Sequence, residues 1–116
     1  IPTQLGLLSS LEHLDLTTNL LSGDIPSQLM NLKRLTSLYL AENNFNQGPI
    51  PTFIYSLNSL KELSLKNTKR DGSISELIQN LANLVLLDFD DNLLSGSIPS
   101  QIGTLLNLEF LLLNRN

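Results

Sequence analysis

Apolar residues recur along the chain in one long repeating pattern. Five leucines open successive copies of a leucine-rich phrase, and subtraction of their numbers gives intervals of 24, 25, 24 and 24 residues: Leu11, Leu35, Leu60, Leu84 and Leu108. A fixed period of this length indicates a stacked repeat array rather than an ordinary globule. We therefore predict a single array over residues 1–116, with a partial repeat at 1–10, full repeats at 11–34, 35–59, 60–83 and 84–107, and a partial repeat at 108–116.

Each repeat has two halves with different periodicities. The first half reads Leu-x-x-Leu-x-Leu, and the alternation of its last two leucines with polar residues predicts a short strand with one buried face. In the second half the apolar spacing is four, three and three, as in Ile25, Leu29, Leu32 and Leu35. This spacing favours a 3-10 or irregular helical turn. One strand per repeat predicts a parallel sheet on the concave side of an α/β solenoid, with the turns on the convex side.

An asparagine follows the predicted strand in four copies of the repeat: Asn19, Asn43, Asn92 and Asn116. Where the chain turns away from the sheet, backbone N–H and C=O groups lose their strand partners. A short amide with two donors and an acceptor can satisfy these groups. We interpret the asparagines as a structural ladder.

The loop after the asparagine carries a recognisable signature. It reads Gly23-Asp24-Ile25-Pro26 in one repeat and Gly96-Ser97-Ile98-Pro99 in another, and Ile102-Gly103 follows the second copy. These residues resemble the plant-specific subtype of leucine-rich repeat, and the resemblance covers the whole chain. It implies a right-handed superhelix with an added short strand near the Leu-Ser-Gly segment. Arrays of this subtype form ectodomains of receptor-like kinases and receptor-like proteins, and also secreted polygalacturonase-inhibiting proteins.

The third repeat departs from the pattern. Thr68 stands at the asparagine position, and Arg70 stands where the other repeats have an apolar side chain. Because an unpaired guanidinium is costly to bury, we expect the loop to swing outward and to expose Arg70. Lys69, Arg70 and Asp71 would then form a contact point for a partner. The alternative is that this repeat has only diverged from the pattern and has no role in binding. The extra residue of the second repeat, near Gln47, is expected to bulge the same edge.

Residues between the strand leucines are expected to face solvent on the concave side, and several of them are candidates for partner binding. Leu86, Phe110 and Leu112 put apolar side chains at such positions on adjacent strands, and contiguous exposed apolar surface often marks an interaction site. The alternative is that later repeats or a cap cover them. The polar candidates in the same columns are Tyr39, Asp88 and Asp90.

The stretch from Asp88 to Asn92 superficially resembles the start of a calcium-binding loop. It has Leu93 where such a loop needs glycine and Pro99 where it needs glutamate, so it fits a calcium site poorly. We expect surface ion pairs instead, joining Lys66 to Asp90 and Arg115 to Asp91. No metal and no cofactor are predicted.

Composition narrows the classes of function. The net charge is −4 with seven basic residues, which argues against a nucleic-acid surface. The chain has no cysteine and a single histidine, His13. A serine–histidine–carboxylate arrangement would need His13, Asp15 and a serine such as Ser37, and nothing indicates an oxyanion hole, so we predict no enzyme activity. No apolar run is long enough to cross a membrane. The sequence contains no N-glycosylation acceptor, which weakens a secreted assignment slightly.

We therefore predict a protein-recognition module, an excerpt of a larger receptor-like or secreted leucine-rich-repeat protein. It would bind a protein or peptide through its concave face at the cell surface or outside the cell, next to further repeats or caps of the parent chain. The alternative is a structural scaffold or assembly subunit of a larger complex inside a plant or algal cell.

Overall fold

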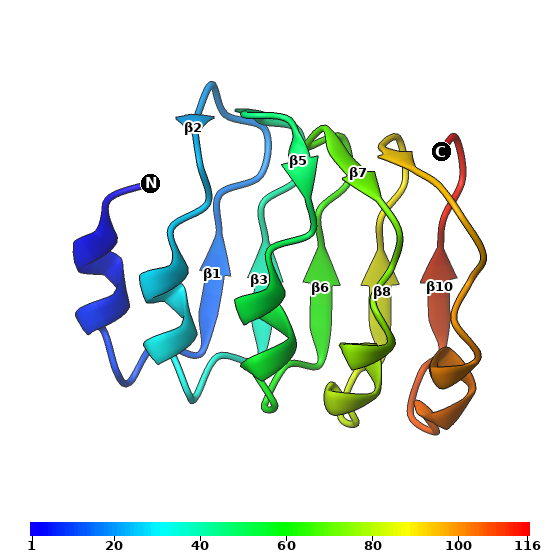
Figure 1. Ribbon diagram of the computed structural model, residues 1–116. Coiled ribbons are helices and arrows are strands. Elements are labelled where there is room, and N and C mark those ends of the chain that lie inside the picture. Colours follow the sequence, from blue (N-terminus) through cyan, green and yellow to red (C-terminus); the bar gives the residue numbers. More distant parts are fainter.

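The computed structural model describes residues 1–116, and the chain forms a one-dimensional stack of repeats (Figure 1). One strand of each repeat joins a five-stranded parallel sheet with the order β1-β3-β6-β8-β10. These strands are β1 (His13–Asp15), β3 (Ser37–Tyr39), β6 (Glu62–Ser64), β8 (Leu86–Asp88) and β10 (Phe110–Leu112). The predicted parallel sheet, one strand per repeat, is confirmed.

Short 3-10 helices line the opposite side of the stack (Figure 1). They are η1 (Thr3–Leu7), η2 (Ser27–Asn31), η3 (Thr52–Ser56), η4 (Glu76–Asn80) and η5 (Ser100–Thr104). Four of them begin directly after a proline, whose fixed φ suits a helix start. In the third repeat Ser75 replaces the proline, and its hydroxyl oxygen accepts a hydrogen bond from the Leu77 N–H at 3.2 Å. None of these helices is long enough or apolar enough to span a bilayer.

A second set of short strands runs along one edge of the stack, as the family resemblance implied. It consists of β2 (Ser22–Gly23), β4 (Asn44–Phe45), β5 (Gly48–Pro49), β7 (Arg70–Gly72) and β9 (Leu93–Leu94). The extra residue of the second repeat divides this edge, because β4 pairs back to β2 while β5 starts a separate sheet with β7 and β9. Asn46 and Gln47 lie between the two short strands.

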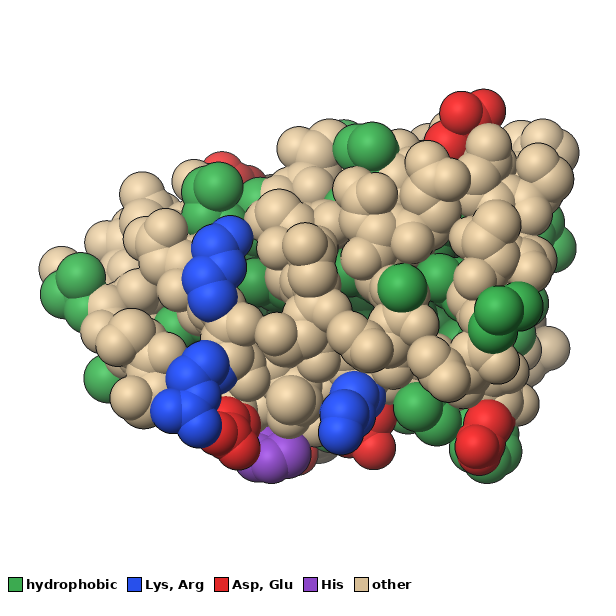
Figure 2. All heavy atoms as spheres, turned by 90° about the horizontal axis from the view of Figure 1, so that it is seen from below, with side chains coloured by type: hydrophobic (Ala, Val, Ile, Leu, Met, Phe, Trp, Pro, Cys, Tyr) green, Lys and Arg blue, Asp and Glu red, His purple; other side chains and the backbone are tan.

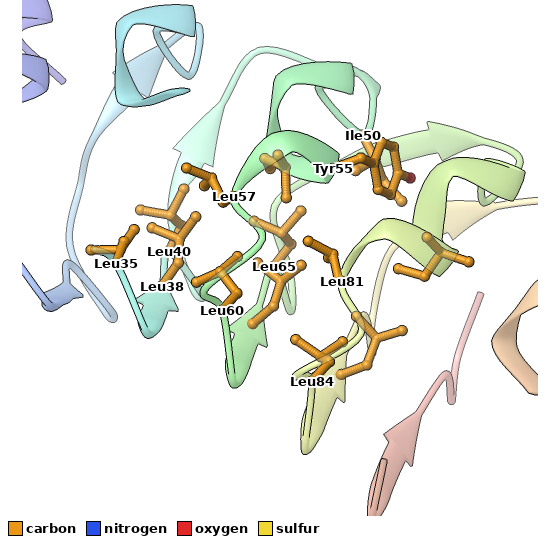
Figure 3. Packing of buried hydrophobic residues seen from close by; sticks show 14 of the residues in the cluster. Leu35, Leu38, Leu40, Ile50, Tyr55, Leu57, Leu60, Leu65, Leu81 and Leu84 are labelled. Carbon is orange, nitrogen blue, oxygen red and sulfur yellow. The ribbon is translucent and has the colours of Figure 1, made fainter. Parts of the chain in front are cut away.

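The core fills the space between the sheet and the helices. In Figure 3, leucines of the strand segments, such as Leu38, and leucines from the helical side, such as Leu57, point into the same interior. The middle residues of β3, β6 and β8 are fully buried. Burial is uneven along the stack: Leu8 is 49% exposed, and Ile98 is 60% exposed against 8% for Ile25 at the equivalent position of an earlier repeat.

Candidate functional site

The concave face is built by the alternation of the five main strands. Each three-residue strand points its central leucine toward the core, where all but Leu111 (39% exposed) are buried. The first and third residues point toward the concave face, although Ser37 and Ser64 are themselves buried there at 4% exposure. The register aligns these outward residues in two columns. The first column contains His13, Ser37, Glu62, Leu86 and Phe110, and the second contains Asp15, Tyr39, Ser64, Asp88 and Leu112.

Polar groups on β1, β3 and β6 form one hydrogen-bonded network. The Ser37 hydroxyl donates to Glu62 Oε2 at 2.8 Å, and the Tyr39 hydroxyl donates to the same oxygen at 2.7 Å. On the other side, His13 Nδ1 lies 2.9 Å from Ser37 Oγ. The hydrogen bonds from Tyr39 and Ser37 hold the pKa of Glu62 below its ordinary value. Burial, together with the bond to Glu62, raises the pKa of Tyr39 to about 12.

This network is not a catalytic triad, although it contains a histidine, a serine and a carboxylate. Ser37 lies between the other two groups, and its hydroxyl donates a hydrogen bond to Glu62, whose lowered pKa makes it a weak base. The serine hydroxyl is also nearly inaccessible, because Ser37 is only 4% exposed. The arrangement fixes the orientation of the Glu62 carboxylate and does not activate a nucleophile.

The carboxylates farther along the sheet are held by neutral donors in the same way. Asp88 accepts hydrogen bonds from the Ser64 hydroxyl at 2.8 Å and from the Asp90 N–H at 3.1 Å. Asp90 in turn accepts from the N–H of Asn114 at 2.6 Å and from its side-chain amide at 3.3 Å. Asp15 accepts from the Thr17 N–H at 2.9 Å, and this bond lowers the pKa of Asp15.

The apolar candidates lie together on β8 and β10. Phe110 stands beside Leu86 in the register, and Leu112 stands beside Asp88. Phe110 is 54% exposed, while Leu86 and Leu112 are partly buried. The three residues therefore lie at solvent-facing positions of the concave sheet, as predicted, and their role in binding stays a prediction.

The ion pairs agree only in part with the sequence prediction. Arg115 donates to both carboxylate oxygens of Asp91, with the second contact at 2.7 Å, so this predicted pair is confirmed. These bonds lower the pKa of Asp91. The predicted pair between Lys66 and Asp90 is wrong. Lys66 Nζ instead lies 3.8 Å from Glu42 and 4.0 Å from Asp91, because the Asp90 carboxylate is turned toward Asn114.

The predicted exposure of Arg70 is also wrong. Its side chain is 5% exposed, and β7 stays in the edge sheet between β5 and β9. The guanidinium donates to three backbone carbonyls, at 3.0 Å to Thr68, at 3.3 Å to Pro49, and to Asn46. Burial lowers the pKa of Arg70, but these acceptors satisfy the charge without a carboxylate partner.

Lys69 alone of the predicted basic contact point remains exposed at this edge. Its ammonium group donates to the side-chain oxygen of Asn44, and its backbone has a positive φ of 61°. The neighbouring Asp71 accepts a hydrogen bond from Gln47 at 2.9 Å. The structure therefore separates Lys69 and Arg70 from the concave candidates and places them in the packing of the second repeat against the third.

The hydrogen-bonded network around Glu62 was not found from the sequence. The signal was available, because His13, Ser37 and Glu62 occupy the same position of three successive repeats. Repeat spacing does not define side-chain rotamers, and the rotamer of Tyr39 determines that its hydroxyl points toward Glu62.

Comparison with known proteins shows the family. The family model "Leucine Rich Repeat" matches residues 10–32, 34–57, 59–81 and 83–105, which is most of the chain. Receptor like protein 21 of Arabidopsis thaliana is 39% identical over 122 aligned residues, covering 100% of this chain and 12% of the relative. Receptor-like protein 35 of the same plant is 44% identical over 108 residues, covering 92% of this chain and 11% of the relative. The chain thus spans about one eighth of the length of these relatives.

Solved structures give the same result. The ectodomain of the Arabidopsis receptor kinase HAESA, in complex with an extended IDA peptide hormone, has a TM-score of 0.95 and 39% identity, over 98% of this chain and 19% of that one. The ectodomain of the Arabidopsis receptor kinase SOBIR1 has a TM-score of 0.91 and 37% identity, over 100% of this chain and 62% of that one. With one strand and one 3-10 helix per repeat, and with plant receptor ectodomains as its relatives, the chain belongs to the leucine-rich-repeat family.

Proposed function

We propose that this segment is a ligand-recognition module of a larger plant receptor-like protein, and that it binds a protein or peptide partner through its concave face outside the cell. The observation that carries the proposal is the exposure of Phe110 on the sheet, where it is 54% exposed beside partly exposed Leu86. An aromatic side chain in a contiguous apolar patch gains most from being covered by a partner.

The different roles of the buried and the outward-facing residues support the same proposal. The central leucines of the strands and the asparagines after them are occupied by the core and by backbone groups, as when Asn92 donates to Leu65 O at 2.8 Å. The outward residues of the strands differ from repeat to repeat and are not needed to close the core. Variable side chains on a rigid frame are the arrangement on which specific recognition is built.

The relatives supply a second line of support. The HAESA ectodomain is seen with a peptide hormone, and in another structure with the hormone and a co-receptor. The ectodomain of GASSHO1/SCHENGEN3, which has a TM-score of 0.95 and 42% identity over 100% of this chain and 14% of that one, is seen with CASPARIAN STRIP INTEGRITY FACTOR 2. We extend to this chain only the class of partner, a peptide or protein.

A displayed library of random peptides, selected on the immobilised chain, tests the proposal. We expect enriched peptides whose binding weakens on the order of tenfold or more in Phe110→Ser, because that change removes the largest exposed anchor. The matched control is Leu77→Ser, since Leu77 is 43% exposed but lies on η4, on the convex side. Circular dichroism verifies that both variants are folded.

Two results would overturn the proposal. One is a selection that enriches no peptide over an unrelated protein surface. The other is an equal loss of binding in Phe110→Ser and Leu77→Ser, since this would mean that the concave face has no special part in recognition. Either result would favour the scaffold alternative.

A further inference from the structure

The concave face carries carboxylates that have no ion-pair partner. Its two basic side chains, Lys66 and Arg115, are engaged with Glu42 and Asp91. No lysine, arginine or N-terminus lies within ion-pair distance of the other four carboxylates, which are Asp15, Glu62, Asp88 and Asp90. Besides the hydrogen bonds described above, His13 and Lys61 contribute to lowering the pKa of Glu62 but form no ion pair with it. The face therefore carries an excess of carboxylates without ion-pair partners along β1, β6 and β8.

These carboxylates are also fixed in place. Glu62 accepts two hydrogen bonds from hydroxyl groups, and Asp88 accepts one from a hydroxyl and one from a backbone N–H. A carboxylate has about four acceptor positions, so each retains acceptor capacity for a further donor. Neutral donors orient the negative charge without cancelling it, which lowers the entropy lost when a cation binds.

Charged side chains of both signs gather on one side of the stack when it is seen from below. In Figure 2, which shows the stack from below, most of the visible charged side chains and the histidine gather along one margin. The only histidine belongs to β1, so this margin is the strand side. The same view shows hydrophobic and uncharged atoms over most of the remaining surface.

An apolar patch adjoins the charge within the same column of the sheet. Glu62, Leu86 and Phe110 are successive members of that column on β6, β8 and β10. Neighbouring strands lie about 4.8 Å apart, so the carboxylate position and the aromatic position are separated by roughly 10 Å across the strands. A partner that crosses the strands would meet a negative charge first and a large apolar surface two strands later.

We propose that the partner of the concave face, given the recognition function proposed above, is an extended peptide segment with a lysine or arginine and a large apolar residue three positions apart. An extended left-handed helix of the polyproline II type rises about 3.1 Å per residue and has three residues per turn, so residues three apart face the same side at roughly 9 Å. This distance matches the separation between Glu62 and Phe110. The basic side chain lies over Glu62 and Asp88, and the apolar side chain lies over Phe110 and Leu86.

The sequences of the selected peptides test this inference independently of the proposed function. We expect the library selected on the wild-type chain at low ionic strength to be enriched in peptides with a basic residue three positions from a leucine, isoleucine, methionine or aromatic residue. The strongest such peptide, synthesised with blocked ends, is then titrated against the chain by calorimetry. The blocked ends ensure that only side-chain charge is measured.

Charge variants test whether Glu62 and Asp88 bind the basic residue of the peptide. In the double variant Glu62→Gln and Asp88→Asn, we expect binding of this peptide to weaken about threefold to tenfold, and its dependence on salt to diminish. The matched control is Asp24→Asn and Glu76→Gln, which removes the same net charge outside the concave columns, from the edge and from η4. The control should bind within about a factor of two of wild type.

The outcomes separate the two proposals. Peptides that need Phe110 but are acidic or uncharged, or that have no preferred spacing, would overturn the basic partner and leave the recognition function standing. Equal weakening in the two charge variants would also overturn it, because the effect would then come from net charge alone. A selection without peptides that depend on the concave face would overturn both.

Discussion

In two polar regions of this molecule, charged side chains have different roles. At the edge, the Arg70 guanidinium is buried and donates to three backbone carbonyls, so its hydrogen-bonding capacity is used by the fold. On the concave face, Glu62 and Asp88 accept bonds from neutral donors and form no ion pair. A charged residue at a variable position is therefore not by itself a sign of a binding site. What distinguishes the two regions is whether the charged group remains accessible to a partner: Arg70 is buried, whereas Glu62 and Asp88 are partly exposed.

The edge also shows why the fold needs Arg70. In other repeats the asparagine amide reaches back to a carbonyl of the preceding repeat, as Asn43 does to Leu16 O at 2.8 Å. Thr68 makes no such bond to the preceding repeat: its hydroxyl donates to Leu65 O of its own repeat at 2.6 Å and lies 3.5 Å from Asn92 Oδ1 of the following one. Arg70, two residues later, donates to Asn46 and Pro49 of the preceding repeat. We infer that the arginine replaces the inter-repeat bonds that the threonine lacks.

Removal of the edge arginine should give the largest change in stability. We expect Arg70→Ala to lower the free energy of unfolding by about 2 kcal/mol, because buried carbonyls lose their donor and the side-chain volume is left empty. Urea denaturation followed by circular dichroism measures the change. Lys69→Ala is the matched control, since Lys69 is exposed, and it should stay within about 0.5 kcal/mol of wild type. Equal losses in the two variants would remove the distinction between the buried and the exposed cation.

Restoring the asparagine should make the arginine less necessary. In the double variant Thr68→Asn and Arg70→Leu, an amide can again reach Leu40 O and an apolar residue again fills the edge. We expect this variant to be about 1 kcal/mol more stable than the sum of the two single variants predicts, because residues that share a function are coupled. A double-mutant cycle in urea measures the coupling. A coupling near zero would show that Arg70 does not compensate for Thr68.

The concave network should respond to alkaline pH with a smaller change. The pKa of Tyr39 is raised to about 12 from an ordinary value of 10.0. A group whose pKa is higher in the folded state stabilises the fold fully below its unfolded pKa, and this contribution is lost as pH rises. We therefore expect stability to decline between about pH 10 and 12 by this route.

The measurement is made in the Tyr55→Phe variant, in which Tyr39 is the only tyrosine. Its ionisation can be followed by ultraviolet absorbance, and Glu62→Gln should bring the pKa of Tyr39 closer to its ordinary value. A Tyr39 that titrates near pH 10 with Glu62 intact would contradict the hydrogen bond between them.

The sequence predicted the repeated parts of the fold well, and its failures have identifiable causes. Apolar periodicity placed the strands and the 3-10 helices, since these depend on which residues must be buried. Arg70 was misplaced because its acceptors belong to the second repeat, where the extra residue brings the carbonyls of Asn46 and Pro49 within reach. The Lys66 pairing was wrong because repeat spacing defines neighbouring positions but not the rotamers that choose between Asp90 and Asp91.

The candidate site was predictable to the same extent. The column positions of Leu86, Phe110 and Asp88 follow from strand alternation and register, and the structure agrees with them. The lack of ion pairs at Asp88 and Glu62 could not be read from composition, because the chain contains seven basic residues. The pairing of Arg34, Lys66 and Arg115 with other carboxylates, and the burial of Arg70 in the edge, are properties of the folded array.

A nuclear magnetic resonance titration would separate the two polar regions in one experiment. The isotope-labelled chain is titrated with the strongest selected peptide, and amide shifts are followed for every residue. We predict that shifts concentrate on β6, β8 and β10, at Glu62–Ser64, Leu86–Asp88 and Phe110–Leu112, while β7 at Arg70–Gly72 and the 3-10 helices stay unchanged. Shifts concentrated on β7 or on the convex helices would contradict recognition by the concave face.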